Sequence, residues 1–238
     1  MTTSAGRAIA LAAALLVAAA CGGDLTLPDP TGAGFTLAKV GGDGQTGTVG
    51  EELPLPVVVR VLSGTGKPVV GQNVLFSLPE GETGKVTPAA AQTNADGEAT
   101  ARWELGTVPG EHALEARLPS VGTEAEREVF AASAKAASPD TVRAVSALFQ
   151  PGRRGQTLEA PLVVALVDRF GNPVPDTAVE WRVVAGGGQV SADETRSAAD
   201  GTASVSWTLG GGIGVQKVTA TVAGATGSPV TFSATVLF

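Results

Sequence analysis

The chain contains one residue pattern twice. The segment from about residue 35 to 134 reappears from about 142 to 238, with an offset of 104 to 105 residues. The matched segments are Gly44-Gln45-Thr46 with Gly155-Gln156-Thr157, Gly66-Lys67-Pro68-Val69 with Gly171-Asn172-Pro173-Val174, Ala95-Asp96-Gly97 with Ala199-Asp200-Gly201, and Trp103-Glu104-Leu105-Gly106 with Trp207-Thr208-Leu209-Gly210. Glycines, turn residues and large apolar residues coincide, so the chain is predicted to be a tandem repeat.

Within each repeat the apolar residues alternate with a period of two, which is typical of half-buried strands. The clearest runs are Leu53, Leu55, Val57, Val59, Val61, then Val74, Phe76, Leu78, and in the second repeat Val179, Trp181, Val183 and Val230, Phe232, Ala234, Val236. Turn residues separate the runs, as at Asp96-Gly97 and Gly186-Gly187-Gly188. About seven short strands in roughly 100 residues predict a β-sandwich.

The predicted fold is all-β, with two tandem immunoglobulin-like β-sandwich domains after a signal peptide and a flexible tether. The expected limits are 1–20 for the signal, 21–34 for the tether, 35–136 for the first domain and 137–238 for the second. A chain with no Tyr and one Cys has neither a tyrosine corner nor an internal disulfide. Each core must therefore rest on apolar burial, with Trp103 and Trp207 as its expected anchors.

The second repeat resembles the group 1 bacterial immunoglobulin-like domains of invasin and intimin type proteins. Residues 167–175, Val-Asp-Arg-Phe-Gly-Asn-Pro-Val-Pro, resemble that family's "D-x-x-G-N-P-V-P" strand and turn, and 199–203 resemble its "T-D-x-x-G-x-A" turn. The first repeat departs from this pattern, with Ser63 for the Asp and Lys67 for the Asn. The resemblance implies a fold and does not specify a ligand.

The first twenty residues have the plan of a secretion signal, with Arg7 followed by an apolar run from Ala8 to Ala20. That run of 13 residues is shorter than the roughly 20 that a membrane-spanning helix needs. Residues 17–21, Val-Ala-Ala-Ala-Cys, resemble the lipobox of bacterial lipoproteins, although Ala18 stands where Leu is usual. The resemblance implies lipidation of Cys21, the only cysteine, while the alternative is an ordinary signal with an incidental Cys.

These features predict an exported protein that a lipid anchors to the cell envelope. In Gram-negative lipoproteins an Asp after the cysteine favours the inner membrane, and Gly22 here favours the outer membrane. The formal charge is -7, and phosphate binding needs clustered Lys and Arg, so nucleic acid is excluded as an expected partner. The adjacent pair Arg153-Arg154 is interpreted as solvated surface.

Two motifs resemble catalytic or cofactor sites but lack the expected context. Residues 42–47 read G-x-G-x-x-G, yet Pro54 and Pro56 follow in place of a helix, so a loop is predicted and no cofactor. His112, the only histidine, is predicted to be an exposed residue at a strand end, since no G-x-S-x-G elbow accompanies it.

Carboxylates cluster without a pair that is marked as acid and base. The clusters are Glu51-Glu52, Glu80 with Glu82, Glu124 with Glu126 and Glu128, and Asp193-Glu194. Glu124, Glu126 and Glu128 are interpreted as a solvated strand edge that discourages pairing with strands of other molecules. Asp96, Asp140, Asp168 and Asp200 could ligate Ca²⁺, but no D-x-D-x-D loop is present, so no metal site is predicted.

The leading hypothesis is a non-enzymatic envelope lipoprotein that acts as a surface-exposed structural or adhesion module. Its expected partners are the membrane, through the lipid, and an unknown protein or glycan at the cell surface. The alternative is an accessory ligand-binding module, for example one that stacks Trp faces against sugar rings. Trp103, Trp181 and Trp207 all lie in apolar alternation, which favours burial over that role.

Overall fold

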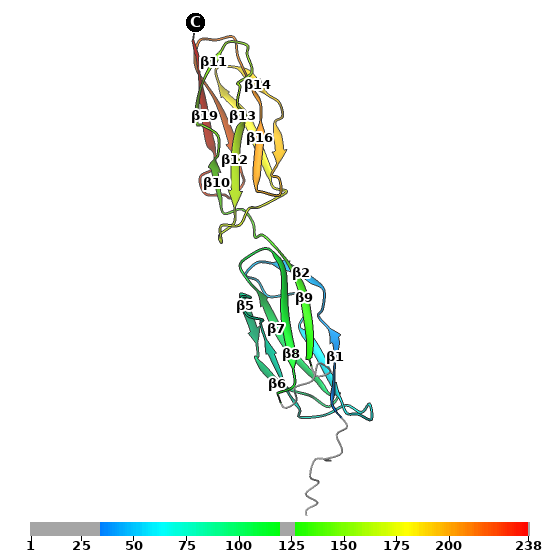
Figure 1. Cartoon of the computed structure of the whole chain (residues 1–238). Coiled ribbons are helices and arrows are strands. Elements are labelled where there is room, and N and C mark those ends of the chain that lie inside the picture. The colour runs from blue at the N-terminus through cyan, green and yellow to red at the C-terminus, as the bar shows by residue number, and fades with distance from the viewer. Residues whose placement is uncertain (1–33, 120–126, 238) are drawn as a thin grey trace, which may run out of the picture. The chain divides into compact units, whose positions relative to one another are not determined.

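The computed structural model of the chain describes residues 34–119 and 127–237, and these residues form β-strands and no helix (Figure 1). The strands of the first repeat are β1 (Thr36–Gly41), β2 (Gln45–Thr48), β3 (Val57–Leu62), β4 (Asn73–Ser77), β5 (Gly84–Thr87), β6 (Ala90–Gln92), β7 (Glu98–Leu105), β8 (Gly110–Arg117) and β9 (Arg127–Lys135). Those of the second are β10 (Thr141–Ala144), β11 (Phe149–Arg153), β12 (Leu162–Val167), β13 (Ala178–Ala185), β14 (Gly188–Val190), β15 (Glu194–Arg196), β16 (Thr202–Val205), β17 (Trp207–Leu209), β18 (Gly214–Thr221) and β19 (Val230–Leu237).

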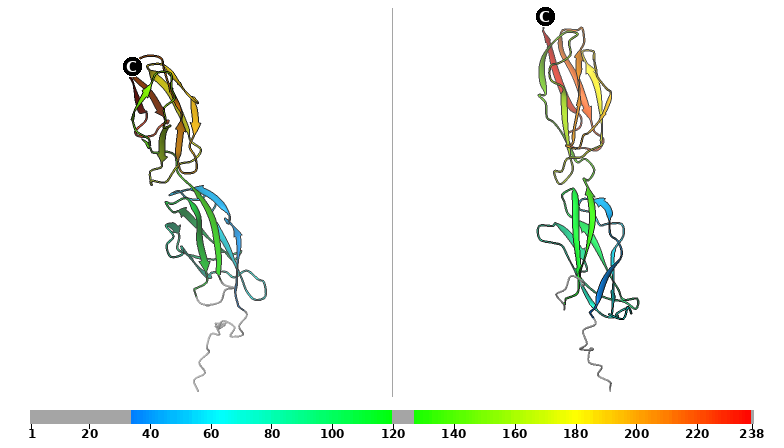
Figure 2. Two further views of the ribbon diagram at one scale, coloured as in Figure 1. Left: turned by 45° about the horizontal axis from the view of Figure 1, so that its top comes forward. Right: turned by 45° about the vertical axis from the view of Figure 1, so that its right-hand side comes forward.

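Each repeat forms two facing sheets, as the views of Figure 2 show. In the first repeat the sheet orders are β1-β3-β7-β5 and β2-β9-β8-β4-β6. In the second repeat the five-stranded order β11-β19-β18-β13-β15 corresponds to the second of these sheets. The opposite sheet is divided into β10-β12-β16 and β14-β17, because the strand that corresponds to β7 is interrupted at Ser206. The all-β sandwich prediction is confirmed.

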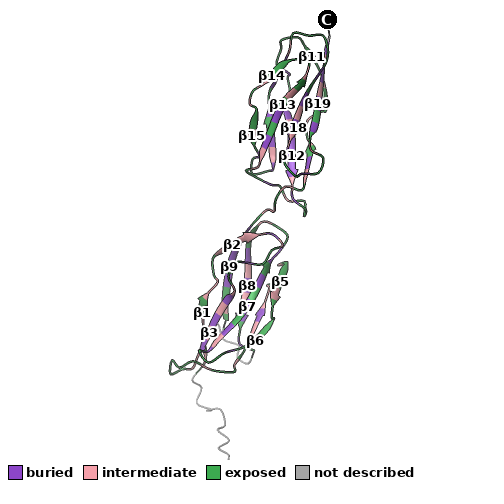
Figure 3. Cartoon of the chain, turned by 180° about the vertical axis from the view of Figure 1, so that it is seen from behind, coloured by how far each residue is buried: buried purple, intermediate pink, exposed green. Residues whose placement is uncertain are grey.

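Alternation of side chains places one hydrophobic core in each repeat, as the burial colours along the strands of Figure 3 show. Trp103, Phe76 and Phe130 are the largest buried side chains of the first core. Trp181, Trp207 and Phe232 are those of the second, and the rings of Trp181 and Phe232 lie 6.2 Å apart between centroids. Full burial of an apolar side chain contributes about 1.5 to 3 kcal/mol, so these residues anchor the cores. Trp103 and Trp207 are the two that the sequence predicted.

The alternation fails at one predicted position, Leu55. Leu53 is buried, but Leu55 is 61 % exposed and lies before β3, which begins at Val57. The two prolines around Leu55 remove backbone donors from this segment, so it cannot join the ladder as a regular strand. The prediction that Leu55 belongs to the half-buried run is therefore wrong.

The parallel edge strands correct one of the matched pairs. Gln45 pairs with Ala132 between β2 and β9, and Gln150 pairs with Ala234 between β11 and β19. Gln150, and not Gln156, is thus the counterpart of Gln45. The glycine that follows each edge strand supports the same alignment, since Gly50 and Gly155 both have φ of 68° and stand five residues after Gln45 and Gln150. The shared letters Gly-Gln-Thr at 44–46 and 155–157 are coincidental.

The Asp-Gly turns occupy equivalent places in both repeats. Gly97 and Gly201 have φ of 73° and 74°, a backbone conformation in which glycine carries no steric cost. A Cβ at Gly201 would lie 2.6 Å from the Leu166 carbonyl oxygen, and one at Gly97 would lie 2.8 Å from that of Val61. Glycine is required at both turns for conformation and for space.

Candidate interaction surface

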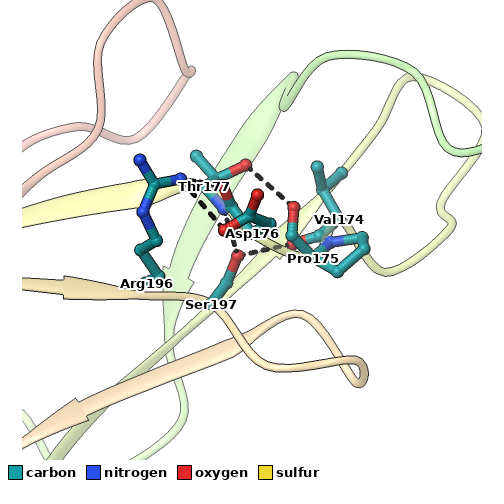
Figure 4. A network of polar contacts seen from close by, with 6 residues as sticks. All are labelled: Val174, Pro175, Asp176, Thr177, Arg196 and Ser197. Atoms are coloured by element: carbon teal, nitrogen blue, oxygen red, sulfur yellow. Dashed lines mark hydrogen bonds and ion pairs between the residues drawn. The ribbon is translucent and has the colours of Figure 1, made fainter.

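The start of β13 is held by a network of polar contacts that Figure 4 shows. Ser197 Oγ donates to the Val174 carbonyl oxygen at 2.8 Å and accepts from the Thr177 N–H at 2.9 Å. Asp176 has a φ of 55°, in the left-handed region where the first repeat has Gly71. Arg196 donates to the backbone carbonyl and the carboxylate of Asp176, at 2.7 and 3.0 Å. The beginning of β13 is therefore fixed in position against β15.

The other end of β13 has a neighbouring strand on one side only. Its ladder with β18 runs from Glu180 to Ala185, whereas its ladder with β15 covers only Ala178 to Glu180. The last contact on the β15 side is the Trp181 N–H, which donates to the Asp193 carbonyl oxygen at 2.8 Å. Arg182–Ala185 consequently have no ladder partner on that side among residues 34–119 and 127–237.

The open edge exists because the chain passes from one sheet to the other at Ser191. The Ser191 N–H donates to the Ser206 carbonyl oxygen at 2.9 Å, and Ser191 Oγ accepts from the Ser206 N–H at 3.1 Å. β14, just before Ser191, pairs with β17 in the opposite sheet, and β15, just after it, pairs with β13. The two neighbouring segments thus diverge and leave space between them.

That space is a groove of about 580 Å³. Its lining residues come from β13, β14 and the start of β15, and they are Glu180–Val184, Gly188–Val190, Asp193 and Glu194. Val183 and Val190 pack against the core from this side, while Glu180, Arg182, Asp193 and Glu194 are exposed. The groove has an apolar floor and a rim of three carboxylates and one guanidinium. We call it the β13 groove.

The residues that the sequence singled out lie elsewhere, with the exception of Trp181, Gly188, Asp193 and Glu194. Cys21, the signal and the tether lie outside the described residues, as do Glu124 and Glu126. Glu128 lies in β9, opposite Ala116 of β8, so it is paired on at least one side. The groove was not predicted, because no residue pattern marks where two neighbouring strand segments change sheets. The only sequence signal was Gly186-Gly187-Gly188, which indicated a turn.

The glycine-rich segment 42–47 is structural. Gln45 Nε2 donates to the Gly42 and Leu55 carbonyl oxygens, and Gln45 Oε1 accepts from the Leu55 N–H. Asp43 accepts from the Ala131 N–H at 2.8 Å and from Lys39 at 2.6 Å. Burial raises the pKa of Asp43, but these hydrogen bonds and the Lys39 charge outweigh it and hold the pKa below its usual value. The last three residues of the segment, 45–47, belong to β2, which pairs with β9.

His112 is buried, which corrects the prediction of an exposed residue. Its relative exposure is 7 %, and it lies near the start of β8 with its side chain directed inward. The Nδ1 atom lies 2.8 Å from Glu82 Oε2, and Nε2 lies 2.8 Å from the Val108 carbonyl oxygen. Glu82 also accepts from the Ala113 N–H at 3.3 Å. Sequence position could not reveal this role, because it depends on a loop 30 residues earlier in the chain.

Gln216 is the counterpart of His112 in the second repeat. It is 1 % exposed, its Oε1 accepts from the Gly210 N–H, and its Nε2 donates to the Gly210 and Gly212 carbonyl oxygens. Two different polar side chains therefore hold loops at the same place in the two sandwiches. His112 belongs to this structural arrangement and has no nucleophile among its hydrogen-bond partners.

Two of the four aspartates considered for Ca²⁺, Asp168 and Asp200, accept hydrogen bonds from donors of their own turns. Asp168 is 2 % exposed and accepts from the N–H groups of Phe170, Asn172 and Ala137 and from Asn172 Nδ2. Burial raises the pKa of Asp168, but these hydrogen bonds outweigh it and lower the pKa overall. Hydrogen bonds from Thr202 lower the pKa of Asp200 in the same way. Within the described residues no group of three or more His, Asp or Glu side chains could hold a metal ion.

All three tryptophans are buried, which removes the proposed sugar platform. Trp103 is 1 % exposed, and Trp181 and Trp207 are 0 % exposed. The indole N–H of Trp181 donates to Thr195 Oγ1 at 2.8 Å. The exposed aromatic side chains are instead Phe149 and Phe170, at 57 % and 39 %. Arg153 and Arg154 are exposed, as expected of solvated surface.

Across residues 34–119 and 127–237, no helix is long and apolar enough to span a membrane. Comparison with family models finds none that matches the chain, and no curated protein sequence matches it.

Solved structures do match. The Escherichia coli adhesin FdeC has a TM-score of 0.60 at 20 % identity, over 85 % of this chain and 62 % of that one. InvE, an adhesin of Yersinia pseudotuberculosis, gives 0.37 at 21 % identity, over 86 % of this chain and 59 % of that one. Invasin, described as a bacterial integrin-binding protein, has a TM-score of 0.39 at 22 % identity, over 85 % of this chain and 39 % of that one. The chain thus spans less than two thirds of these structures.

The similarity to FdeC confirms the fold: the chain has tandem immunoglobulin-like β-sandwiches.

Proposed function

We propose that the chain is a non-enzymatic lipoprotein of the cell envelope, which a lipid on Cys21 anchors and whose two sandwiches form a surface-exposed structural or adhesion module. The observation that carries this proposal is a coincidence of two features. The only cysteine follows an apolar export signal directly, and the residues after it fold as the domains of an adhesin do. A thiol with no possible internal partner is explained by acylation.

The proposed anchor fits the composition of the chain. Each buried methylene contributes about 0.8 kcal/mol, so one acyl chain holds a protein only marginally, and stable anchoring takes two signals. Bacterial lipoproteins that this N-terminus resembles carry three acyl chains. Residues 21–34 serve as the tether, and residues 35–136 and 137–238 as the two domains that it presents. The separate cores of the two repeats support these limits.

A binding or structural role accords with the contacts of the polar residues. Glu52 is paired with Arg102, Glu82 with His112, and Asp168 with four donors. These groups serve the fold, and the surface that remains consists of strand edges and loops. Such surfaces are where sandwich proteins place their binding residues, because the sheets hold them rigidly. We place the protein in the outer membrane, following Gly22.

The accessory carbohydrate-binding alternative now depends on Phe149, which is the most exposed aromatic residue in the described part of the chain. A sugar ring would stack on this single exposed face, with no tryptophan beside it.

The proposal is tested by expressing the full chain with a C-terminal epitope in a Gram-negative host and treating intact cells with protease. We expect wild type to remain with the outer membrane and to lose its epitope, because its domains face outward. Cys21→Ala should leave the membrane fraction. An epitope protected in intact cells would contradict surface exposure, and a wild type as soluble as Cys21→Ala would contradict the anchor.

The partner class is tested with beads that carry residues 31–238, incubated with host cells. Adhesion that survives Phe149→Ala and free sugars favours a protein partner. Adhesion abolished by both favours the carbohydrate alternative.

A further inference from the structure

The β13 groove contains the backbone groups of an unfinished sheet. In an antiparallel ladder, every second residue directs its N–H and C=O to the same side. The Trp181 N–H is bonded on the β15 side, so Val183, two residues later, presents its N–H and C=O to that side as well. No ladder or turn partner reaches Val183 there among the described residues. The next strand position of the sheet is vacant.

A second strand end borders the same space. β14 has β17 as its only ladder partner in the described part of the chain, and Gly188–Val190 line the groove. β13 also carries a bulge at Val184, where its register against β18 shifts between Val183 and Ala185. Bulges occur where strands are bent at edges and near binding sites. The open segment Arg182–Ala185 is about 13 Å long at about 3.3 Å per residue.

We propose that the β13 groove binds an extended peptide segment of a partner protein, which joins the sheet as a strand beside β13. The backbone of the peptide exchanges hydrogen bonds with Val183. Its residue opposite Val183 points inward, where Val183 and Val190 form an apolar floor, and is a small or medium apolar side chain. The strand added is short, because Asp193 closes one end of the groove.

The charge of the rim selects a basic peptide. Glu180 and Glu194 are direct cross-strand partners, an arrangement in which like charges repel. Arg182 reaches Glu180 at 3.3 Å, which leaves Glu194 and Asp193 without a paired cation among the described residues. A Lys or Arg next to the inward apolar residue of the peptide lies beside these two carboxylates and relieves the repulsion.

The first repeat provides a matched control, since its corresponding edge is shorter and is followed by a proline. Its counterpart strand β4 ends at Ser77, and Pro79 follows Leu78 where the second repeat has Val184. The loop after Pro79 is held to β8 by the contact of Glu82 with His112. Peptide binding is therefore expected at the second sandwich alone. This inference rests on the proposed function only for the source of the peptide, a protein at the cell surface.

The test uses isotope-labelled chain from Gly34 to Phe238, which contains both cores, and NMR titration with the peptide acetyl-Thr-Lys-Val-Lys-Thr-amide. This peptide has the same side-chain order in both directions, so it requires no assumption about strand direction. We expect shifts at Val183, Val184 and Gly188–Val190, and none at Ser77 and Leu78. The same peptide with an N-methylated valine should bind about tenfold more weakly, because it cannot complete the ladder.

Two variants locate the interaction. Val183→Pro removes the edge N–H and leaves the β18 side intact, and we expect affinity to fall about tenfold. The pair Asp193→Lys and Glu194→Lys should weaken the lysine peptide and strengthen acetyl-Thr-Glu-Val-Glu-Thr-amide. Resonances of the second repeat outside the groove, such as those of Trp207 and Phe232 in its core, report whether each variant is folded. Should Val183→Pro fail to fold, the charge reversal and the N-methylated peptide decide the question.

Four results of the peptide titrations would overturn the proposal. These are no shifts in the groove at millimolar peptide, equal binding of the N-methylated peptide, undiminished binding to folded Val183→Pro, and a charge reversal without effect. Groove shifts that depend on protein concentration without peptide would also overturn it, because they would make a second copy of the chain the occupant. None of these measurements involves the lipid or the cell surface, so failure here is distinct from failure of the proposed function.

Discussion

Replacing Trp207 by Ala should lower the melting temperature of the second sandwich and leave that of the first unchanged. Trp207 is 0 % exposed in the core of the second repeat, and Trp103 occupies the corresponding place in the first. Truncating a buried Trp to Ala costs about 3 to 5 kcal/mol, from lost transfer free energy and the cavity left behind. A domain of roughly 100 residues loses about 4 to 8 °C in Tm for each kcal/mol, so the second repeat should melt about 12 to 40 °C lower.

Differential scanning calorimetry of residues 34–238 measures this effect. We expect Trp207→Ala to move one transition and Trp103→Ala to move the other. Val184→Ala is the control, because Val184 is 54 % exposed and its truncation should change stability by less than about 0.5 kcal/mol. A single transition that shifts equally in both tryptophan variants would refute the reasoning, since the two cores would then unfold as one unit.

Substitutions at four further positions test the polar and backbone contacts. His112→Ala should cost roughly 1 to 3 kcal/mol in denaturant unfolding, because it removes the side-chain partner of Glu82 and the contact to the Val108 carbonyl oxygen, and His112→Gln should cost less. The lowered pKa of Asp168 means that its ionised form contributes stability above its ordinary pKa, and that this contribution is lost as pH falls through the lowered value. Asp168→Asn should therefore be most destabilising near neutral pH, and the difference from wild type should shrink below pH ~4 in pH-dependent melts. Gly201→Ala should destabilise more than Gly224→Ala in thermal melts: both glycines have φ of 74°, but only at Gly201 would the Cβ meet a backbone oxygen.

The fold was predictable because alternation, turn residues and the internal repeat indicate the same architecture. Trp103 and Trp207 could be assigned to cores since their neighbours in sequence alternate around them. Asp96-Gly97 and Asp200-Gly201 could be assigned to turns because a left-handed backbone favours glycine. These are local properties, and the sequence displays them directly.

Contacts between distant segments could not be predicted. His112 is buried because Glu82 reaches it from a loop 30 residues away. The identity of Gly-Gln-Thr at 44–46 and 155–157 suggested a match, whereas strand pairing aligns Gln45 with Gln150. The β13 groove likewise depends on Ser191 pairing with Ser206 of the opposite sheet. In each case the deciding interaction joins segments whose proximity only the folded chain determines.

The central claim is that Cys21 anchors two immunoglobulin-like sandwiches to the cell envelope, and intact mass of the purified chain tests it most directly. We predict a mature protein that begins at Cys21 and carries the added mass of its acyl chains, that stays with the membrane, and that becomes soluble and unacylated as Cys21→Ala. An unmodified Cys21 on a wild-type protein that fractionates as a soluble chain would contradict the account.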